Sequence, residues 1–347
     1  MAKKANRDRV FLGILSTFTV IMLVLTIVGL VVFNIQVSAY QASGIDDYQT
    51  YSRIYAYIPN NPDSTVSENL YQALREYGLQ NDCLVERIGD DLATSYTKSE
   101  LIAIAIRSKV SGIILEGDDS EETAELIEQA SEAGIPVVTV MTDAPGSAGC
   151  SFIGLNNYSV GVKYSDLVLE AAEDKEGGDV DALVMMSSGS GNESVIYAAI
   201  QESLQTSGVE IDSVVVDADS AFSTEEKVMD ILDEYDEMPD IIVCLSDITT
   251  RCVYQSVVDK NCVGVTSIIG YYGSDTVLEG IERGAIDATL SVDTNQVAQY
   301  CVNALDEYIA MGNVSEYYST GYILIDEDNV YEYLPADPGQ EETDEGN

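Results

Sequence analysis

Short uncharged runs alternate along this chain with longer segments in which apolar residues recur at helical spacing. The short runs, which predict buried strands, are residues 54–58, 112–115, 137–141, 182–186, 213–216, 241–245 and 267–269. The longer segments, which predict amphipathic helices, are residues 66–77, 120–133, 159–172, 193–206, 224–235, 249–259, 274–283 and 296–311. Uncharged strands that alternate with helices are typical of parallel sheets covered by helices on both faces. The pattern therefore predicts an α/β fold.

The longest apolar run, residues 10–33, contains no charged side chain and predicts a transmembrane helix. At about 1.5 Å per residue it would extend roughly 36 Å, enough to cross a hydrocarbon layer of about 30 Å. Residues 1–9 are basic, so we expect them to stay in the cytoplasm and the rest of the chain to face outside. This predicts a single-pass protein of the cell membrane with an extracellular C-terminal domain. The alternative is a signal peptide cleaved after Ala39, although such peptides usually have an apolar run of only about 7 to 15 residues.

The chain beyond this run divides into a linker, a large folded region and a tail. Residues 34–50 are mostly polar and predict a linker between the membrane and the folded region. Residues 334–347 are acidic, contain proline and glycine, and predict a disordered tail. The region between them is about 280 residues long, which is more than one hydrophobic core usually holds. We therefore expect the folded region to consist of two lobes.

The composition excludes several classes of function. The chain has 16 basic and 60 acidic residues and a net charge of −44, so it should repel nucleic acid and anionic lipid headgroups. It has no histidine, which excludes an imidazole base, a Ser-His-Asp relay and a histidine-bound metal. The six cysteines form no Cys-x-x-Cys pair and are predicted to be free thiols. The absence of histidine removes most hydrolase chemistry. We expect a protein that is not an enzyme and that uses neither a cofactor nor a metal.

The loops that follow the predicted strands contain the candidate binding residues. In open parallel sheets, ligands bind beyond the carboxyl ends of the strands. The candidates in these loops are Asn61, Asp63, Glu116, Asp143, Phe222, Ser246, Asp247 and Tyr272. Their amide, carboxylate, hydroxyl and aromatic groups suit a small polar ligand. Because none of these loops contains a basic residue, we expect an electronegative cleft and a neutral or cationic ligand, either a sugar or an amine-bearing molecule.

Three of these candidates have alternative structural roles. Asp143 and Asp247 follow buried strands, where aspartate often caps the next helix by accepting hydrogen bonds from its first amides. Tyr272 also suits the interface between two lobes, since a tyrosine fills space with its ring and keeps a polar tip. The sequence leaves both interpretations open for each residue.

A series of short motifs follows the predicted strands in a fixed order. They are Asn60-Asn61-Pro62, residues 110–115, residues 133–138 leading to Asp143, residues 153–158 with Gly161, residues 241–247, residues 269–273 and residues 284–290. The series resembles the type I periplasmic binding proteins, the ribose, galactose and xylose binders whose fold is shared by the ligand-binding part of LacI-like repressors. The resemblance covers residues 51–333.

The resemblance implies two Rossmann-like lobes joined by three crossing strands. The crossings would fall near Cys150, Val292 and Ser319, so that each lobe is discontinuous in sequence. The N-terminal lobe would then contain residues 51–149 and 293–318, and the C-terminal lobe residues 150–292 and 319–333. A ligand would be held between the lobes, which close on it by a hinge motion.

The resemblance also implies roles for single residues. Asn61 matches an amide that hydrogen-bonds a sugar hydroxyl, and Asp143 matches a carboxylate that accepts from sugar hydroxyls. Other positions depart from the family, which often has arginine where Ser194 stands, aspartate where Tyr272 stands and glutamine where Val292 stands. Ser194 is therefore the ninth candidate binding residue. These departures predict a changed ligand specificity.

These observations predict a membrane-anchored extracellular solute-binding protein that captures a small polar ligand, most simply a sugar. Its partner would be an ABC permease that takes up the ligand or a sensor histidine kinase that detects it. The alternative is an extracellular interaction or docking module that has lost ligand binding, which the residues at Ser194 and Val292 motivate.

Overall fold

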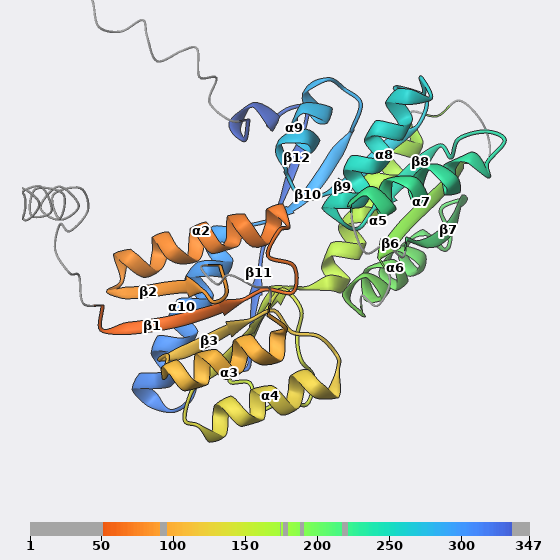
Figure 1. The fold of residues 1–347 in the computed structure, drawn as a ribbon. Coiled ribbons are helices and arrows are strands. Elements are labelled where there is room, and N and C mark those ends of the chain that lie inside the picture. The colour runs from red at the N-terminus through yellow and green to blue at the C-terminus, as the bar shows by residue number, and fades with distance from the viewer. Residues whose placement is uncertain are drawn as a thin grey trace, which may run out of the picture. The chain divides into compact units, whose positions relative to one another are not determined.

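The computed structural model describes residues 51–90, 96–173, 175, 180–187, 191–216 and 221–334 of the 347-residue chain. The predicted basic tail, transmembrane helix and linker lie outside the described residues, as does the predicted tail from residue 335 on. Within the described ranges, no helix combines the length and the apolar character needed to span a bilayer. The described residues from Ser52 on form one compact unit, which contains two sheets (Figure 1).

The first sheet has six parallel strands in the order β11-β5-β4-β3-β1-β2. Its strands are β1 (Arg53–Ile58), β2 (Cys83–Arg87), β3 (Gly112–Leu115), β4 (Val137–Val140), β5 (Ser151–Leu155) and β11 (Tyr317–Thr320). Its helices are α2 (Thr65–Gln80), α3 (Lys98–Ser108), α4 (Glu121–Glu132) and α10 (Thr294–Met311). Helices α2 and α10 enclose one apolar core against the sheet, and α3 and α4 enclose another. We call this sheet with its helices the first lobe.

The second sheet has six strands in the order β12-β10-β9-β8-β6-β7, and only its β10–β12 pair is antiparallel. Its strands are β6 (Val180–Ser187), β7 (Val209–Val216), β8 (Ile241–Cys244), β9 (Ser267–Tyr271), β10 (Ala288–Val292) and β12 (Tyr322–Asp326). Its helices are α5 (Asn157–Glu173), α6 (Gly191–Leu204), α7 (Ala221–Asp233), α8 (Asp247–Asp259) and α9 (Asp275–Glu282), with the short η1 (Val330–Glu332) after β12. Again one core lies on each face of the sheet. We call this part the second lobe.

The predicted fold class is confirmed, because both lobes are parallel sheets with helices on both faces. Periodicity alone did not predict β2, β5, β10, β11, β12 or α3. Strand β2 lies at an edge of its sheet and ends in Glu86 and Arg87, so it lacks the uncharged run of a central strand.

The three passages between the lobes lie after β5, after β10 and between β11 and β12. The first of these differs from the sequence expectation, which placed it near Cys150 and so assigned β5 to the second lobe. In the structure β5 pairs with β4 and β11, and Ile153 is buried in the first-lobe core. The chain therefore leaves the first lobe only after Leu155.

Serine residues determine where several helices begin. Ser64, Ser120 and Ser246 cap α2, α4 and α8, and the side chain of each accepts a hydrogen bond from the backbone N–H three residues further on. Such a cap satisfies one of the free amides of the first helical turn. Because these serines follow β1, β3 and β8, all three helices begin at the carboxyl edge of their sheet, where the candidate site lies.

Candidate ligand-binding site

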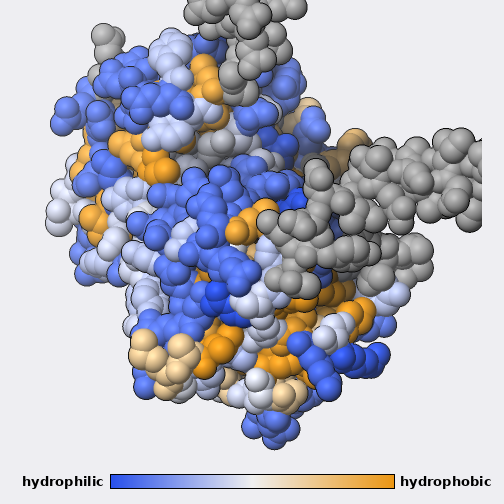
Figure 2. All heavy atoms as spheres, turned by 90° about the vertical axis from the view of Figure 1, so that its left-hand side faces the viewer, coloured by the Kyte–Doolittle hydropathy of each residue, from blue (hydrophilic) through white to orange (hydrophobic). Residues whose placement is uncertain are grey.

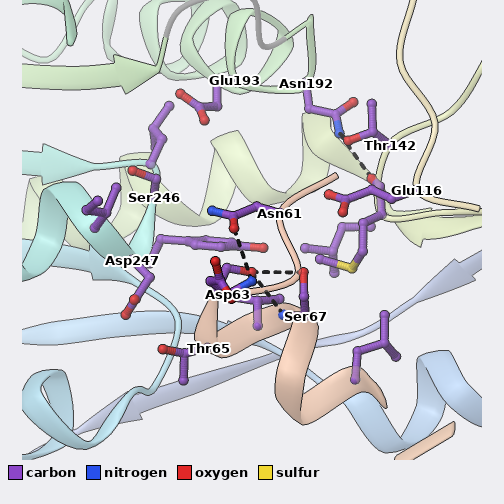
Figure 3. A pocket seen from close by; sticks show the side chains of 18 of the residues that line it. Asn61, Asp63, Thr65, Ser67, Glu116, Thr142, Asn192, Glu193, Ser246 and Asp247 are labelled. Carbon is purple, nitrogen blue, oxygen red and sulfur yellow. Dashed lines mark hydrogen bonds between the residues drawn. The ribbon is translucent and has the colours of Figure 1, made fainter. Parts of the chain in front are cut away.

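A cavity of about 590 Å³ lies at the carboxyl ends of strands from both sheets (Figure 3). The first lobe lines it with the loop between β1 and α2 and with the ends of β3 and β4. The second lobe lines it with the beginnings of α5, α6 and α8 and with the end of β9. The predicted convergence of strand ends from two half-proteins is therefore present. Five of the nine candidate residues line the cavity, namely Asn61, Asp63, Glu116, Ser246 and Asp247.

The loop between β1 and α2 is held in a fixed conformation. The amide oxygen of Asn61 accepts a hydrogen bond of 3.1 Å from the backbone N–H of Asp63, which leaves the amide nitrogen for a ligand. Figure 3 shows the Asn61 side chain within the cavity. From outside the cavity, the Arg87 guanidinium donates to the carbonyl of Pro62 at 3.2 Å and to the carboxylate of Glu68 at 2.8 Å. Arg87 thus ties the binding loop to α2, a role that the sequence did not suggest.

Glu116 is a half-buried acceptor just after β3. Its carboxylate accepts a hydrogen bond of 2.7 Å from the backbone N–H of Asn60. Burial raises the pKa of Glu116 above its ordinary value, against the opposing effects of the Asn60 hydrogen bond and of Lys98. One carboxylate oxygen of Glu116 has no hydrogen bond within the described residues, so it can accept from a ligand hydroxyl or ammonium group.

Ser246 and Asp247 line the cavity from the second lobe. Ser246 caps α8 and Asp247 is its first helical residue, so the cap expected of Asp247 belongs to its neighbour. The Asp247 carboxylate accepts a hydrogen bond of 3.0 Å from Arg251 and another from the Ser274 hydroxyl. Arg251 lies one turn into α8 and is the only cation among the described lining residues. It compensates part of the negative charge that the loops alone predicted.

The other four candidates lie off the cavity lining. The Asp143 carboxylate accepts from the Thr139 hydroxyl at 2.7 Å and from the backbone N–H of Ala144 at 2.8 Å. Ser194 lies on α6 next to the lining residue Glu193. Phe222 lies on α7 with 78% of its surface exposed.

Tyr272 is only 4% exposed and packs among first-lobe core residues, as its alternative interpretation expected. Its backbone is left-handed, with φ of 69°, which turns its ring out of the direction that an extended strand would give it. The preceding residue, Tyr271, lines the cavity in its place. The sequence motif therefore locates this strand end correctly, but the side chain that lines the cavity lies one residue earlier.

Two asparagines complete the cavity near the passage between the lobes. The amide nitrogen of Asn192 donates to the Met141 carbonyl at 3.1 Å, and the amide of Asn157 donates to the Asn192 oxygen at 2.9 Å. Both asparagines are lining residues. Asn157 stands in a motif that the sequence identified, and Asn192 directly precedes a predicted helix, but a single amide gives no signal of its direction.

The lining combines carboxylates, amides and hydroxyls with tyrosine and aliphatic side chains. Such a surface hydrogen-bonds a polyhydroxylated molecule and packs against its apolar faces. In the described part of the chain, no group of three or more Cys, Asp or Glu residues could hold a metal ion. The geometry thus fits the capture of a small polar molecule.

A sequence model of the periplasmic binding protein domain matches residues 55–313. No curated protein matches the chain at a significant level.

Several solved structures share the fold. A glucose-galactose binding protein from Geobacillus stearothermophilus, GanP, is 20% identical, with a TM-score of 0.70 over 80% of this chain and 98% of that chain. The XylFII-LytSN complex contains a chain that is 21% identical, with a TM-score of 0.68 over 80% of this chain and 98% of that chain. A periplasmic solute-binding protein of an ABC transporter from Actinobacillus succinogenes, solved with D-allose, is 16% identical, with a TM-score of 0.70 over 81% of this chain and all of that chain.

Proposed function

The chain belongs to the periplasmic binding protein family, and we propose that it captures a small polar ligand, most simply a sugar, between its two lobes outside the cytoplasm. The observation that supports this most directly is the cavity at the strand ends of both sheets. Its volume of about 590 Å³ lies within the range of about 300 to 1,000 Å³ that is usual for small-ligand sites. We expect binding without catalysis, since the chain lacks histidine and its family consists of solute-binding proteins.

The proposed ligand class rests on the hydrogen-bonding groups of the lining. Asn61 offers an amide donor, while Asp63 and Glu116 offer carboxylate acceptors. A sugar hydroxyl can donate to one such group and accept from another. Structural neighbours bind sugars, since GanP is a glucose-galactose binding protein and the Actinobacillus succinogenes protein was solved with D-allose. An amine-bearing ligand is the second choice, because four lining carboxylates stand against the single cation Arg251.

The partner is proposed from the N-terminal run and from one structural neighbour. Residues 10–33 would hold the binding domain at the membrane, unless the segment is removed after Ala39. A neighbour of this fold occurs in a complex with LytSN, which supports a membrane sensor kinase as a partner. An ABC permease is the other candidate, since the D-allose protein belongs to such a transporter.

A thermal scan of the full-length protein in detergent, with a panel of monosaccharides, disaccharides and polyamines, tests this proposal. A true ligand should raise the melting temperature, because binding at about 100 times Kd adds about 2.7 kcal/mol to the free energy of unfolding. In Asn61→Ala the same ligand should bind about fivefold more weakly, as for the loss of one hydrogen bond. Asn313→Ala, at an exposed asparagine that does not line the cavity, is the matched control.

A panel that shifts nothing would contradict ligand capture and favour the docking module. A ligand that stabilises Asn61→Ala as much as the unaltered protein would place its binding elsewhere.

A further inference from the structure

Two asparagine contacts link the lobes in a reciprocal arrangement. The first helix of the first lobe, α2, contains Asn69, whose amide donates to the hydroxyl of Tyr272 in the second lobe at 2.7 Å. Helix α6, which follows the first strand of the second lobe, contains Asn192, whose amide donates to the carbonyl of Met141 in the first lobe at 3.1 Å and to the hydroxyl of Thr142 at 3.4 Å. Figure 3 shows Asn192 beside Thr142, the residue after Met141. Each lobe thus sends an asparagine from the helix after its first strand to the other lobe.

The two acceptors occupy equivalent places. Met141 directly follows β4, the fourth strand of the first lobe, and Tyr272 directly follows β9, the fourth strand of the second lobe. Both have a left-handed backbone, with φ of 62° and 69°. Among the described non-glycine residues with positive φ, these are the only two at the carboxyl end of a strand. Residues with side chains adopt this conformation at an energetic cost, and only where surrounding contacts enforce it.

Packing and further hydrogen bonds hold both contacts in place. Tyr272 is buried among residues of α2 and α10, and Met141 packs against the same core. The backbone N–H of Tyr272 donates to Leu290 at 2.9 Å, and that of Met141 donates to Ile153 at 3.0 Å. Asn157 donates to the Asn192 amide oxygen at 2.9 Å and so orients this amide. Each left-handed residue is therefore anchored in a sheet and presents a polar group to the opposite lobe.

We propose that these two contacts, Asn69–Tyr272 and Asn192–Met141, form a double clasp that sets the equilibrium between arrangements of the lobes. Its effect on affinity rests on the proposed function, because a ligand held between the lobes binds only the fraction of molecules in the competent arrangement. Opening one contact favours opening of the other, because both join the same two lobes. Loss of one ordinary hydrogen bond would increase the unclasped population about fivefold.

Hydrogen–deuterium exchange of the ligand-free, full-length protein in detergent micelles tests the clasp. Exchange follows the population of locally open states. In Asn69→Ala we expect faster exchange at the other contact, in peptides covering residues 139–143. In Asn192→Ala we expect faster exchange in peptides covering residues 270–275. Each increase should be about fivefold, and each lies at the contact that was not altered.

A conservative variant separates the clasp from general damage. Asn192→Ala removes both the donor to the Met141 carbonyl and the contact with the Thr142 hydroxyl, whereas an aspartate could still accept from that hydroxyl. In Asn69→Asp the carboxylate can accept from the Tyr272 hydroxyl, so exchange at residues 139–143 should stay unchanged. Asn303→Ala is the matched control, because it removes a hydrogen bond from the Tyr77 hydroxyl, of 3.1 Å, within the first lobe alone.

Exchange that rises only beside each substitution, or not at all, would overturn the proposal. So would an Asn69→Asp variant that behaves like Asn69→Ala. Should the variant of one contact fail to fold, the variant of the other contact still tests the proposal. Each variant predicts faster exchange at the contact that it does not alter. Because no ligand is added, a negative sugar screen would count against the proposed function and leave this result intact.

Discussion

Glu116 and Asp118 lie two residues apart after β3, yet their environments shift their pKa values in opposite directions. Burial raises the pKa of Glu116, and the Asn60 hydrogen bond and Lys98 only partly offset this. Burial also acts to raise the pKa of Asp118, but hydrogen bonds from Lys98, Ser120 and Thr123 outweigh it and hold the pKa well below its ordinary value. The first carboxylate therefore favours a proton in the folded protein, whereas the second disfavours one.

Glu116→Gln should change how stability depends on pH. A carboxyl group with a raised folded pKa contributes stability that is fully present below its unfolded pKa and is lost as pH rises through its folded pKa. The glutamine keeps the acceptor for Asn60 but cannot ionise. The free energy of unfolding of the variant, minus that of the unaltered protein, should therefore be larger at neutral pH than at pH about 4. Urea titrations at both values measure this difference.

Asp118→Asn is the matched control and should show the opposite trend. A lowered folded pKa contributes stability that is present above the unfolded pKa and lost as pH falls through the folded one. We expect this substitution to lower the free energy of unfolding by about 1 kcal/mol at neutral pH, because it weakens a network of charged hydrogen bonds that solvent partly screens. The loss should become smaller as pH falls. Two variants with the same pH trend would contradict the assignment of the shifts.

At the scale of elements, the spacing of α5 and α6 determines where the second lobe places its side of the cavity. The two helices approach closely at Gly161, where a Cβ atom would lie 2.5 Å from the Ile196 carbonyl oxygen and 2.6 Å from the Ala199 Cβ. Helix α6 carries the lining residues Asn192 and Glu193 at its start. The glycine therefore contributes to the site through packing, although it is outside the cavity.

Gly161→Ala should destabilise the protein by about 1 to 3 kcal/mol, the usual cost of overpacking. This loss should exceed the gain of about 1 kcal/mol that alanine brings in helix propensity. Gly191→Ala, on α6 with no atom near the added methyl group, is the matched control and should not destabilise. Equal free energies of unfolding for the two variants in urea would show that the helices separate at no cost.

At the scale of the whole molecule, the net charge of −44 acts against the compact state. Like charges repel one another more strongly when the chain is folded, and few cations are present to offset them. Several of these cations are already paired with carboxylates, as in Arg87–Glu68 and Arg251–Asp247. Figure 2 shows a largely hydrophilic face, interrupted by smaller apolar patches. Stability should therefore depend on the ionic strength of the solution.

Raising sodium chloride from about 10 to about 150 mM should raise the melting temperature, because the Debye length falls from about 30 to about 8 Å. Tetramethylammonium chloride should act equally, since screening depends on charge and concentration. Calorimetric scans in both salts measure this effect. A melting temperature that falls with salt would contradict self-repulsion, and a rise with sodium alone would indicate a specific ion site.

The order of strands and helices along the chain establishes the α/β fold and the carboxyl-end position of the site. Residues 112–115 and 241–244, for example, are uncharged and are buried central strands. Burial on both faces leaves a local mark, since such a strand is uncharged and mostly apolar. Glu116 and Ser246 lie at the cavity because the loops that contain them follow the carboxyl ends of these strands.

The tertiary structure determined the remaining strand pairing and the directions of the side chains at the site. These features depend on contacts between residues that are distant in sequence. Hydrophobic patterning cannot reveal that β5 pairs with β4 and β11 in the first sheet. Nor can it show that left-handed backbone turns Tyr272 toward Asn69 and leaves the cavity to Tyr271. Asp143 likewise bonds to Thr139 instead of lining the cavity. Local sequence indicates which side chains are buried or polar, whereas their direction depends on the partners that the packed lobes bring to them.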